Sequence, residues 1–494
     1  MNNIRKNIQK ELSILGRDLK NTHISDLLDS AELKNNVIEL DLLTFDYSKQ
    51  RIDQKALDFL IEIPNIINLR ESLDQLFAGK VTNRSEQRAV THTIYRNQTS
   101  VKDFGLIFSE REKIRSFLNK SKSGYHFKNV ICLCIGGSRI GPELLNEFIS
   151  LDSQANIYFC SSYDLEEVKD ALRKCQQSET IVFASSKSFE TAEILKNLEH
   201  VKAWFSNSPE INLEDHLYGI SANASAMTEF GIKKANQFLL LDTIGGRFSI
   251  WSSISLPAFV NGDYELYLEL LYGAHLADEY TKNTPWEFNI SVLMALLSIW
   301  NRNSLDISNH GIFTYHFKLR SLTKYIAQLS MESNGKSVNF DLNVSPFMTT
   351  PLIWGGYGIE NQHSTFQWLM QGKTETSCDF IGVNNNEFDT KDSFEMLLSQ
   401  VLAMTKGKED QSFPFKTVRG NNPCSIFKIK HLDLRTLGFL LALYEHMVFV
   451  EALILDIDPF DQWGVQLGKQ LSLNARSDKD FLKPFFSSSV LPKS

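Results

Sequence analysis

The chain has 494 residues, which is long enough for two or three domains with sizeable cores. It is 43% hydrophobic and 22% charged and contains no low-complexity tract, a composition typical of a soluble globular protein. Its formal net charge of −8 argues against a nucleic-acid partner, because binding a phosphate backbone usually needs a basic face.

The cysteines and the apolar stretches favour a reduced protein outside the membrane. Six cysteines are too few for a disulfide scaffold, and Cys132 and Cys134 lack the spacing of a zinc or redox pair. The most apolar stretch, residues 437–455, contains Glu445 and Glu451 and therefore predicts a buried helix, not a membrane span. With no apolar signal core at the N-terminus, we expect a cytoplasmic protein without a membrane partner.

Residues 1–100 predict helices joined by polar connections. Within them, residues 83–92 have the pattern of a helix start with Ser85 as the N-cap, because a serine hydroxyl can accept from the free amides of a first turn. This block indicates no chemistry by itself.

The pattern changes at residue 129 to a strand, a turn and a helix. Residues 129–135 are a continuous apolar run, as expected of a buried parallel strand, and the turn after them contains Gly136 and Gly137. Free amides at the start of the next helix could bind an anion. A dinucleotide fingerprint would need glycine where this chain has Ser138, so the turn suits a sugar or phosphate hydroxyl better. A purely structural turn fits equally well.

Residues 180–185 predict another buried strand, followed by a turn rich in hydroxyl groups. Ser186, Lys187, Ser188 and Thr191 lie between this strand and a helix that begins near residue 192. Hydroxyls, a lysine and free helix amides are what a phosphate monoester needs, although a cluster of N-caps would look the same.

Further strands are predicted at residues 217–221 and 237–242. Strands that alternate with helices imply a doubly wound parallel sheet with ligands at the carboxyl ends of its strands. The turn Gly245-Gly-Arg247 follows, and its glycines would let the Arg247 guanidinium approach an oxyanion closely. A surface arginine in a turn is the alternative.

Apolar residues recur at helical spacing between Arg320 and Asn334, so we predict an amphipathic helix that ends at Gly335. Gln328 and Glu332 share one face of it. Glu332 lies in the last turn, where the helix dipole disfavours a carboxylate by roughly 0.3–1 kcal/mol. It is therefore either a solvated glutamate that tolerates this cost or a carboxylate suited to act as a general base.

A second α/β unit is predicted to open near residue 311, with strands at 351–354 and 378–383. His363 lies at a loop–helix junction after the first of these strands. It is a candidate acid/base group because imidazole gains and loses protons near neutrality, although a lone histidine is more often structural.

A polar helix is predicted after the buried helix 437–455. Gln462, Gln466 and Lys469 recur at helical spacing and would form one polar face, which could equally be a solvated surface. The tail beyond Arg476 is polar.

Several of these blocks resemble signature sequences of the glucose-6-phosphate isomerase family. The most specific are the runs Gln328-Leu-Ser-Met-Glu-Ser-Asn-Gly-Lys336 and Phe460-Asp-Gln-Trp-Gly-Val-Gln-Leu-Gly-Lys469. Matching blocks in family order cover most of the chain and begin near Asn83, Gly136, Ser186, Gly245 and Trp354.

The resemblance implies an α/β fold of two doubly wound, parallel-sheet sugar-isomerase (SIS) domains flanked by helices. We expect an N-terminal helical region at residues 1–100 that packs on the larger domain. A first, phosphate-binding SIS domain would follow at 101–262, a second SIS domain at 263–475 and a C-terminal tail at 476–494.

The resemblance also implies an aldose–ketose isomerase of glycolysis and gluconeogenesis that converts glucose 6-phosphate to fructose 6-phosphate, without a metal or an organic cofactor. His363, helped by Lys469, would open the sugar ring in the neighbouring subunit of a homodimer. Glu332 would carry a proton between C2 and C1, and Arg247 would stabilise the enediolate. The substrate-binding residues would be Gly137, Ser138, Ser186, Lys187, Ser188, Thr191, Gln328 and Gln462.

Three departures from the family pattern bear on substrate affinity. Glu190 replaces a small hydroxyl residue, and a carboxylate about 5 Å from the phosphate would cost roughly 3 kcal/mol at an effective dielectric near 20. Arg139 replaces an acidic residue, and the loop at 356–363 differs from the common Glu-Pro-Gly-Thr-Asn-Gly-Gln-His pattern. We expect Glu190 to point away from the phosphate or to be screened.

Other functions remain open at this point. One is a broader aldose–ketose isomerase that also accepts mannose phosphate, and another is a non-catalytic sugar-phosphate-binding or interaction protein on the same fold. A dehydrogenase is disfavoured by Ser138.

Overall fold

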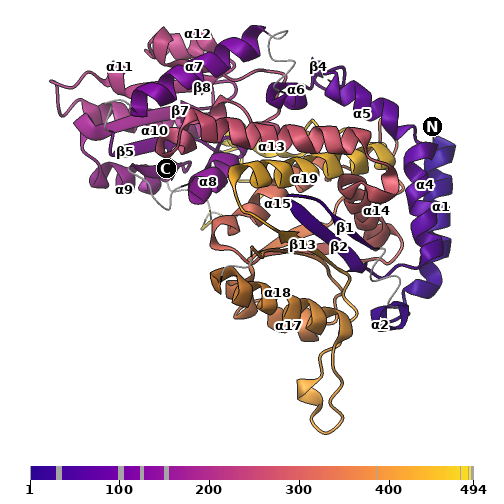
Figure 1. The fold of residues 1–494 in the computed structure, drawn as a ribbon. Helices are drawn as coiled ribbons and strands as arrows, with labels where there is room; N and C mark the ends of the chain where they lie inside the picture. Colours follow the sequence, from indigo (N-terminus) through magenta and orange to yellow (C-terminus); the bar gives the residue numbers. More distant parts are fainter. Residues whose placement is uncertain are drawn as a thin grey trace.

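The computed structural model describes residues 2–28, 36–97, 105–122, 127–149, 155–385, 388–478, 480–487 and 489–490. They form two large β-sheets, both mainly parallel and both covered by helices on two faces (Figure 1). The predicted fold class, two doubly wound α/β domains of the sugar-isomerase type flanked by helices, is confirmed.

The first sheet has five parallel strands in the order β6-β5-β7-β8-β9. Val130 and Cys132 belong to the main core beside the helices α7 and α8, whereas Ile131 and Leu133 pack in a second core beside α9 and α10. Both faces of the strand are thus buried, which explains its continuous apolar run. The elements are α7 (Gly105–Lys122), β5 (Asn129–Leu133), α8 (Gly137–Ile149), β6 (Asn156–Cys160), α9 (Glu166–Lys174), β7 (Thr180–Ser185), α10 (Ala192–Phe205), α11 (Leu213–His216), β8 (Leu217–Ser221), α12 (Ala224–Glu229) and β9 (Gln237–Leu239).

The second sheet has six strands in the order β1-β2-β13-β12-β10-β11. Phe313 and Phe380 face a core that includes Phe366 and Leu397, while Ile312 and Ile381 face the main core. The elements of this half are β10 (Asn309–Thr314), α15 (Leu322–Asn334), β11 (Leu352–Tyr357), α16 (Gly358–Gln362), α17 (Phe366–Gln371), β12 (Ser377–Val383), α18 (Phe388–Lys406) and β13 (Cys424–Ile429).

The expectation of a helical region at residues 1–100 is incomplete, because this region also supplies strands to the second sheet. β1 (Val37–Glu39) and β2 (Leu43–Lys49) form an antiparallel pair, and β2 pairs antiparallel with β13. The helices of the region are α1 (Asn2–Leu19), α2 (Ile24–Leu27), α4 (Gln54–Ile66), α5 (Leu69–Phe77) and α6 (His92–Arg96).

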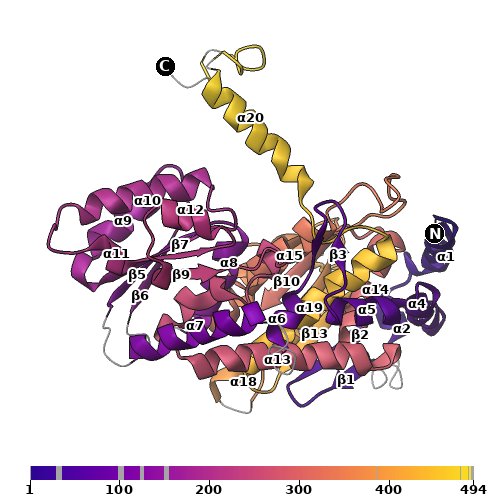
Figure 2. The same ribbon diagram turned by 90° about the horizontal axis from the view of Figure 1, so that it is seen from above.

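Long helices join the two sheets. α13 (Tyr264–Asn283) and α19 (Leu434–Leu455) lie side by side across the middle of the molecule, and α14 (Ile290–Asn303) packs against α19 (Figures 1 and 2). Within the described part of the chain, α19 alone is long and apolar enough to cross a membrane, and 94% of its most apolar window is buried in the protein. The prediction of a buried helix here is confirmed.

Short 3-10 helices complete the connections. The proposed domain boundary at residue 262 falls between one of them, η6, and α13. They are η3 (Gln177–Glu179), η4 (Lys234–Asn236), η5 (Gly246–Phe248), η6 (Ser253–Asn261), η7 (Trp286–Phe288), η8 (Phe317–Leu319), η9 (Pro414–Lys416) and η10 (Trp463–Val465).

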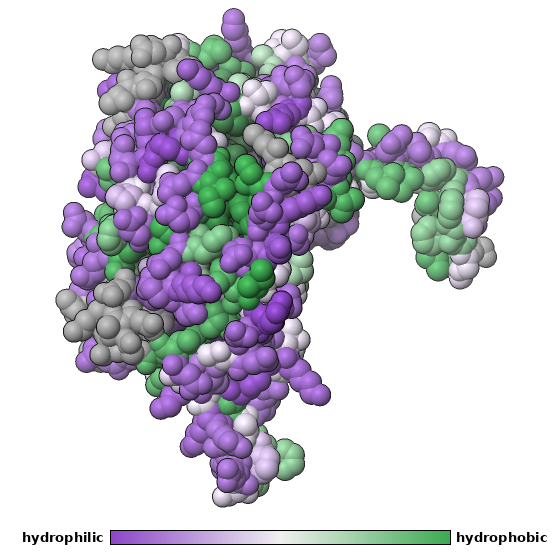
Figure 3. Space-filling model, turned by 90° about the vertical axis from the view of Figure 1, so that its right-hand side faces the viewer, coloured by the Kyte–Doolittle hydropathy of each residue, from purple (hydrophilic) through white to green (hydrophobic). Residues whose placement is uncertain are grey.

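Two further features concern the hairpin near Ser85 and the C-terminal helix. Ser85 was predicted to cap a helix, and this prediction is wrong: Ser85 lies in the turn of a hairpin between β3 (Thr82–Asn83) and β4 (Arg88–Ala89). α20 (Gln466–Ser477) projects from the body of the protein as an arm (Figures 2 and 3). The arm and the described residues that follow it carry exposed apolar side chains at Leu467, Leu471, Leu473, Phe485, Phe486 and Val490.

Candidate active site

Turns from both halves of the molecule meet where the strands of the first sheet end. The start of α8 packs directly on the start of η5: a Cβ at Gly137 would lie 2.3 Å from the Gly246 carbonyl oxygen, so only glycine fits this close approach. A Cβ at Gly136 would lie 3.6 Å from the side-chain nitrogen of Gln328 on α15. The turn at Gly136 and Gly137, the turn that carries Arg247, and α15 are therefore neighbours.

Arg247 is 4% exposed and its guanidinium is held from several directions. Its Nε donates to Ser333 Oγ at 2.6 Å, and one terminal nitrogen donates to the backbone carbonyls of Pro459 and Asp461. The other terminal nitrogen donates to Gln462 Oε1 at 3.1 Å. Such a fixed fork of donors is what arginine offers and lysine does not.

Glu332 completes this arrangement from the last turn of α15. Its carboxylate lies 3.6 Å from the Arg247 nitrogen that also contacts Gln462 and accepts a hydrogen bond of 3.1 Å from Gln328 Nε2. We call Arg247, Gln328, Glu332 and Gln462 the proton-transfer cluster, after the role that the resemblance implies. The prediction that Gln328 and Glu332 share a helix face is confirmed, as is the end of the helix at Gly335.

Burial sets the electrostatics of the cluster. Desolvation lowers the pKa of Arg247 to about 10, and the carboxylates of Glu332, Asp461 and Asp458 oppose that shift by stabilising the cation. A cation paired with a carboxylate can stabilise a negative charge that develops beside it without competing as a base.

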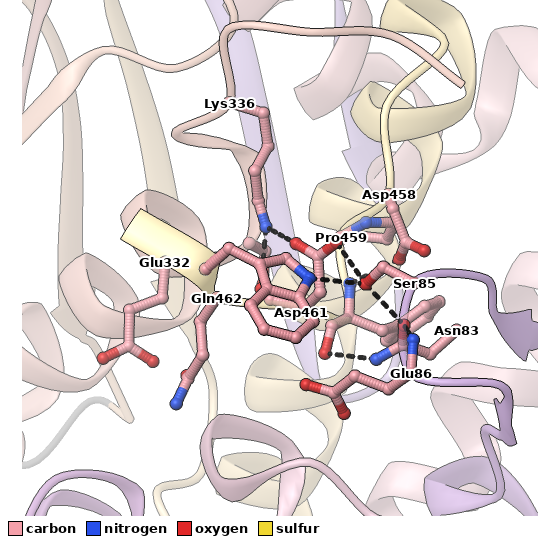
Figure 4. Close-up of polar contacts among 12 residues, drawn as sticks. Asn83, Ser85, Glu86, Glu332, Lys336, Asp458, Pro459, Asp461 and Gln462 are labelled. Atoms are coloured by element: carbon pink, nitrogen blue, oxygen red, sulfur yellow. Dashed lines mark hydrogen bonds and ion pairs between the residues drawn. The ribbon is translucent and has the colours of Figure 1, made fainter. Parts of the chain in front are cut away.

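A cavity of about 650 Å³ opens next to Glu332 and Gln462. Lys336 lines it and donates from Nζ to Asp461 Oδ1 at 2.6 Å (Figure 4). Burial lowers the pKa of Lys336, and its pairing with Asp461 works against the shift. Among the described residues, those of the Ser186 turn do not line this cavity. Of the four residues of the cluster, Glu332 and Gln462 line this cavity, whereas Arg247 and Gln328 do not.

The predicted phosphate-binding residues form a turn at the carboxyl end of β7. The hydroxyls of Ser186 and Thr191 are 2.7 Å apart, and Ser188 accepts from the Glu190 amide at 3.3 Å. Phe189 adopts a left-handed conformation with φ of 56° and buries its ring in the core of the first domain. The buried ring anchors a turn whose flanking residues, Ser188 and Glu190, are exposed.

Lys187 of this turn has a carboxylate partner that sequence reasoning did not foresee. Its Nζ lies 3.0 Å from Asp242 Oδ1 and 2.9 Å from the Asp242 carbonyl oxygen, which Arg88 also contacts at 2.7 Å. Burial and then the nearby Arg88 charge lower the pKa of Lys187, while Asp242 opposes the shift. The turn therefore gathers cations beside its hydroxyls.

The departures from the family pattern are accommodated locally. Glu190 is exposed to solvent. Arg139 is engaged away from the glycine-rich turn: it donates to Ser161 at 2.6 Å and forms ion pairs with Glu143 and Glu167.

His363 and Lys469 are not brought to the proton-transfer cluster within the chain. His363 is the C-cap residue that follows α16; it is exposed, and its backbone amide donates to the Glu360 carbonyl. Lys469 is exposed on the projecting α20. Within the described residues, no hydrogen bond or ion pair joins either side chain to the cluster. We call His363 and Lys469 the ring-opening pair, after the role that the resemblance implies.

Sequence reasoning missed Ser333, Asp461 and Asp242 as partners of the candidate residues. Ser333 and Asp461 lie inside the quoted signature runs, next to Glu332 and Gln462, so their position was a usable signal. Asp242 ends a predicted strand, but nothing in its neighbourhood pointed to Lys187.

Comparisons with known proteins agree with this geometry. The sequence matches the family described as phosphoglucose isomerase over residues 46–484. The glucose-6-phosphate isomerase of Pseudoalteromonas translucida (strain TAC 125) is 34% identical, over 92% of this chain and 90% of its own. That of Acinetobacter baumannii (strain AYE) is 35% identical, over 91% of this chain and 89% of its own.

Solved structures give the same result. The crystal structure of a glucose-6-phosphate isomerase from Chlamydia trachomatis superposes with a TM-score of 0.88 at 28% identity, covering 98% of this chain and 96% of that one. A hypothetical protein from Thermus thermophilus shares the fold, with a TM-score of 0.71 at 20% identity, covering 88% of this chain and 100% of that one. With its sequence matched over most of its length and its fold shared, the chain belongs to the phosphoglucose isomerase family.

Proposed function

We propose that this protein interconverts glucose 6-phosphate and fructose 6-phosphate through an enediolate, and that the proton-transfer cluster carries the reaction. The observation that carries the proposal is the Glu332 carboxylate 3.6 Å from a buried Arg247 guanidinium, where the two halves of the chain meet. Family membership and the names of its relatives support the same activity.

The chemistry divides between these two groups. Removal of the proton at C2 of the open-chain aldose needs a base beside that carbon, and Glu332 has the reach. The electrons move to the carbonyl oxygen at C1, where Arg247 stabilises the negative charge. A proton then passes from the C2 hydroxyl to the C1 oxygen, and Glu332 returns the carbon-bound proton to C1, which gives the ketose with its carbonyl at C2. Gln328 and Gln462, which contact Glu332 and Arg247, hold the sugar hydroxyls.

The Ser186 turn is the proposed phosphate site. Hydroxyls of Ser186, Ser188 and Thr191, the ammonium of Lys187 and the amides at the start of α10 supply the donors that a phosphate monoester accepts. Gly137 and Ser138, at the start of α8, line the sugar between this turn and the Arg247 turn. The chain's own donors supply the charge stabilisation, so the proposed reaction uses no cofactor.

The ring-opening pair points to a homodimer. His363 and Lys469 are exposed, and the arm that carries Lys469 has exposed apolar residues that a second copy of the chain could cover (Figure 3). We propose that His363 of one subunit serves the site of the other, where it moves a proton between the C1 hydroxyl and the ring oxygen with help from Lys469.

Complementation tests the shared site. Mixing unfolded Glu332→Gln and His363→Ala chains and refolding them together should restore about a quarter of the wild-type rate, because half of the dimers contain one intact site. No recovery, or a fully active monomer in sedimentation, would contradict the shared site.

The decisive assay for the activity measures glucose 6-phosphate formed from fructose 6-phosphate, with EDTA present. We expect robust turnover by the wild type and a loss of about 10²–10⁴-fold in Glu332→Gln, because a positioned base contributes a factor of that size. Glu409→Gln, which alters an exposed glutamate outside the cluster, is the matched control. Equal rates in wild type and Glu332→Gln would remove Glu332 from the mechanism. Sugar-phosphate binding without turnover would favour a binding protein, and equal use of mannose 6-phosphate a broader isomerase.

The cellular setting of the proposal is the cytoplasm, in glycolysis and gluconeogenesis. All six cysteines are free, and five are buried, as suits a protein that works in a reducing compartment.

A further inference from the structure

The hairpin of β3 and β4, which the proposed reaction does not use, holds the segment that carries Gln462. Asn83 Nδ2 donates to the Phe460 carbonyl at 3.1 Å, and the Arg84 amide donates to Asp458 Oδ2 at 2.9 Å. Ser85 Oγ contacts the Asp461 carboxylate (Figure 4) and also accepts from Trp463 Nε1. The hairpin is thus hydrogen-bonded to residues 458–463 at several points.

Among residues 458–463, Asp461 makes the largest number of hydrogen bonds. It is 8% exposed, and both carboxylate oxygens are bonded: Oδ1 accepts from Lys336 Nζ at 2.6 Å and Oδ2 accepts from Ser85 Oγ at 2.7 Å. Its backbone carbonyl accepts from Lys336 at 2.7 Å and from Arg247 at 2.9 Å. Asp461 therefore connects the hairpin both to Lys336, just after the end of α15, and to Arg247.

The direction of the Arg247 fork depends on this segment. One terminal nitrogen is engaged by the carbonyls of Pro459 and Asp461, and Nε is engaged by Ser333. Only the remaining terminal nitrogen is left to face Gln462 and Glu332. A shift of the Asp461 carbonyl would rotate the planar guanidinium and move that nitrogen away from Glu332.

Ser85 is well placed to fix Asp461, because its hydroxyl is used in both directions. It accepts from Trp463 Nε1 at 2.8 Å while it donates to Asp461. Of the two acceptors within reach of the hydroxyl, the Asp461 carboxylate at 2.7 Å is closer than Asn83 Oδ1 at 3.3 Å. The contacts to Asp461 and Trp463 lie on either side of Gln462 in the sequence.

We propose that Asp461, braced by Ser85 on the hairpin, is a positioning residue that aims Arg247 at the oxyanion of the enediolate. The inference rests on the proposed isomerase reaction, in which Arg247 meets charge that develops only as the C2 proton leaves. Positioning of this kind acts on turnover more than on substrate binding, because the ground-state sugar carries little charge at that oxygen.

The test uses full-length Asp461→Asn and Ser85→Ala proteins. The asparagine variant keeps the shape of the side chain but loses its charge. We expect its kcat to fall about 10–100-fold with KM within about threefold, since small misplacements of a catalytic group have effects of this size. Ser85→Ala should lose about 3–10-fold in kcat, and Ser85→Thr, which keeps the hydroxyl, should recover most of it. Ser13→Ala is the control, because the Ser13 hydroxyl donates to the Gln9 carbonyl of its own helix.

Two inhibitors provide a readout that a merely structural role would not move. A planar hydroxamate that mimics the enediolate should bind Asp461→Asn more weakly by the same factor as kcat, whereas glucitol 6-phosphate, which cannot form an enediolate, should bind as it does to wild type. Wild-type kcat in both variants would overturn the proposal. So would equal weakening of the two inhibitors together with a lower Tm.

The outcome also separates this inference from the proposed reaction. A wild-type protein that does not turn over would refute the isomerase proposal, whereas active wild type with unaffected variants would refute only the role of Asp461. If Asp461→Asn does not fold, the Ser85→Ala and Ser85→Thr pair decides, by the same ratio of inhibitor affinities.

Discussion

Arg247 is buried and held by bonds to Ser333, Gln462 and two backbone carbonyls, whereas His363 and Lys469 stand exposed on a short helix and on a projecting arm. The proton-transfer cluster is thus assembled within one chain, with contacts that fix each polar group. The ring-opening pair is not. Proton transfer at carbon tolerates little error in position, while an acid/base group that opens a ring can be supplied by another subunit when the substrate is bound.

The largest expected effect comes from breaking the assembled half. Arg247→Lys keeps a positive charge but cannot reach Ser333, Pro459 and Asp461 together, so we expect kcat to fall about 10²–10³-fold. The loss should be the same for 5-deoxyfructose 6-phosphate, an open-chain analogue that cannot close its furanose ring. Steady-state rates on both substrates check this, with the surface substitution Arg435→Lys as control. A loss on the cyclic substrate alone would place Arg247 in ring opening.

His363→Ala should break the other half selectively. We expect about a 10²-fold loss of kcat on fructose 6-phosphate, because a general acid/base group is removed, and little change on the 5-deoxy analogue. The ratio of the rate on fructose 6-phosphate to the rate on the 5-deoxy analogue shows how far ring opening is independent of proton transfer. Equal losses on both substrates would show that His363 acts in proton transfer or in folding instead.

Lys187→Met should affect binding rather than turnover. We expect KM to rise about tenfold with kcat within about threefold, because a charge-assisted contact to the phosphate is lost. Burial lowers the pKa of Lys187 below its usual 10.5, so the ammonium loses its proton at lower pH than an exposed lysine would. Only the cation attracts the phosphate dianion, and wild-type KM should therefore rise as the pH increases through the alkaline range below 10.5.

The variant provides the control for this titration. KM of Lys187→Met should stay flat over the same pH range, while Lys128→Met, which removes an exposed lysine paired with Glu179, should behave like wild type. A pH-dependent KM in Lys187→Met would assign the titration to another group.

The smallest effect is expected from Glu190→Ser. Because Glu190 is exposed, water and salt screen its repulsion of the phosphate, and removing it should lower KM by no more than about threefold at low ionic strength. The gain should disappear in about 1 M salt. A tenfold change that persists in salt would mean that Glu190 turns toward the substrate. Glu229→Ser, another exposed glutamate of the same domain, is the matched control.

The sequence is most informative where both the pattern and the chemistry are local. The predictions of a strand at residues 180–185 and of a helix end at Gly335 agree with the structure, because apolar runs and a terminal glycine are short-range signals. The contact of Gln328 with Glu332 follows from helix geometry alone.

The remaining features depend on pairing across long separations. Residues 43–49 alternate apolar and polar side chains, yet they fall inside the predicted helical region, since nothing local shows that their partner is β13. The local pattern around Ser85 predicts a helix cap, but its hydroxyl serves Asp461, far along the chain. The bonds of Arg247 to Pro459 and Asp461 are equally invisible before the chain is folded.

The pairing of β2 with β13 also bears on how the protein is made. The strands of the first sheet lie between Asn129 and Leu239 and can pair as soon as they leave the ribosome, whereas β2 must wait until Ile429 has been synthesised. At synthesis rates of about 5–20 residues per second, that delay is roughly 20–80 s. During it, β2 can pair with β1 but lacks β13 on its other edge, and the apolar side chains of Leu43, Phe45 and Tyr47 lack the core that forms with that strand. The nascent chain is therefore expected to need chaperone protection at its N-terminus until translation is nearly complete.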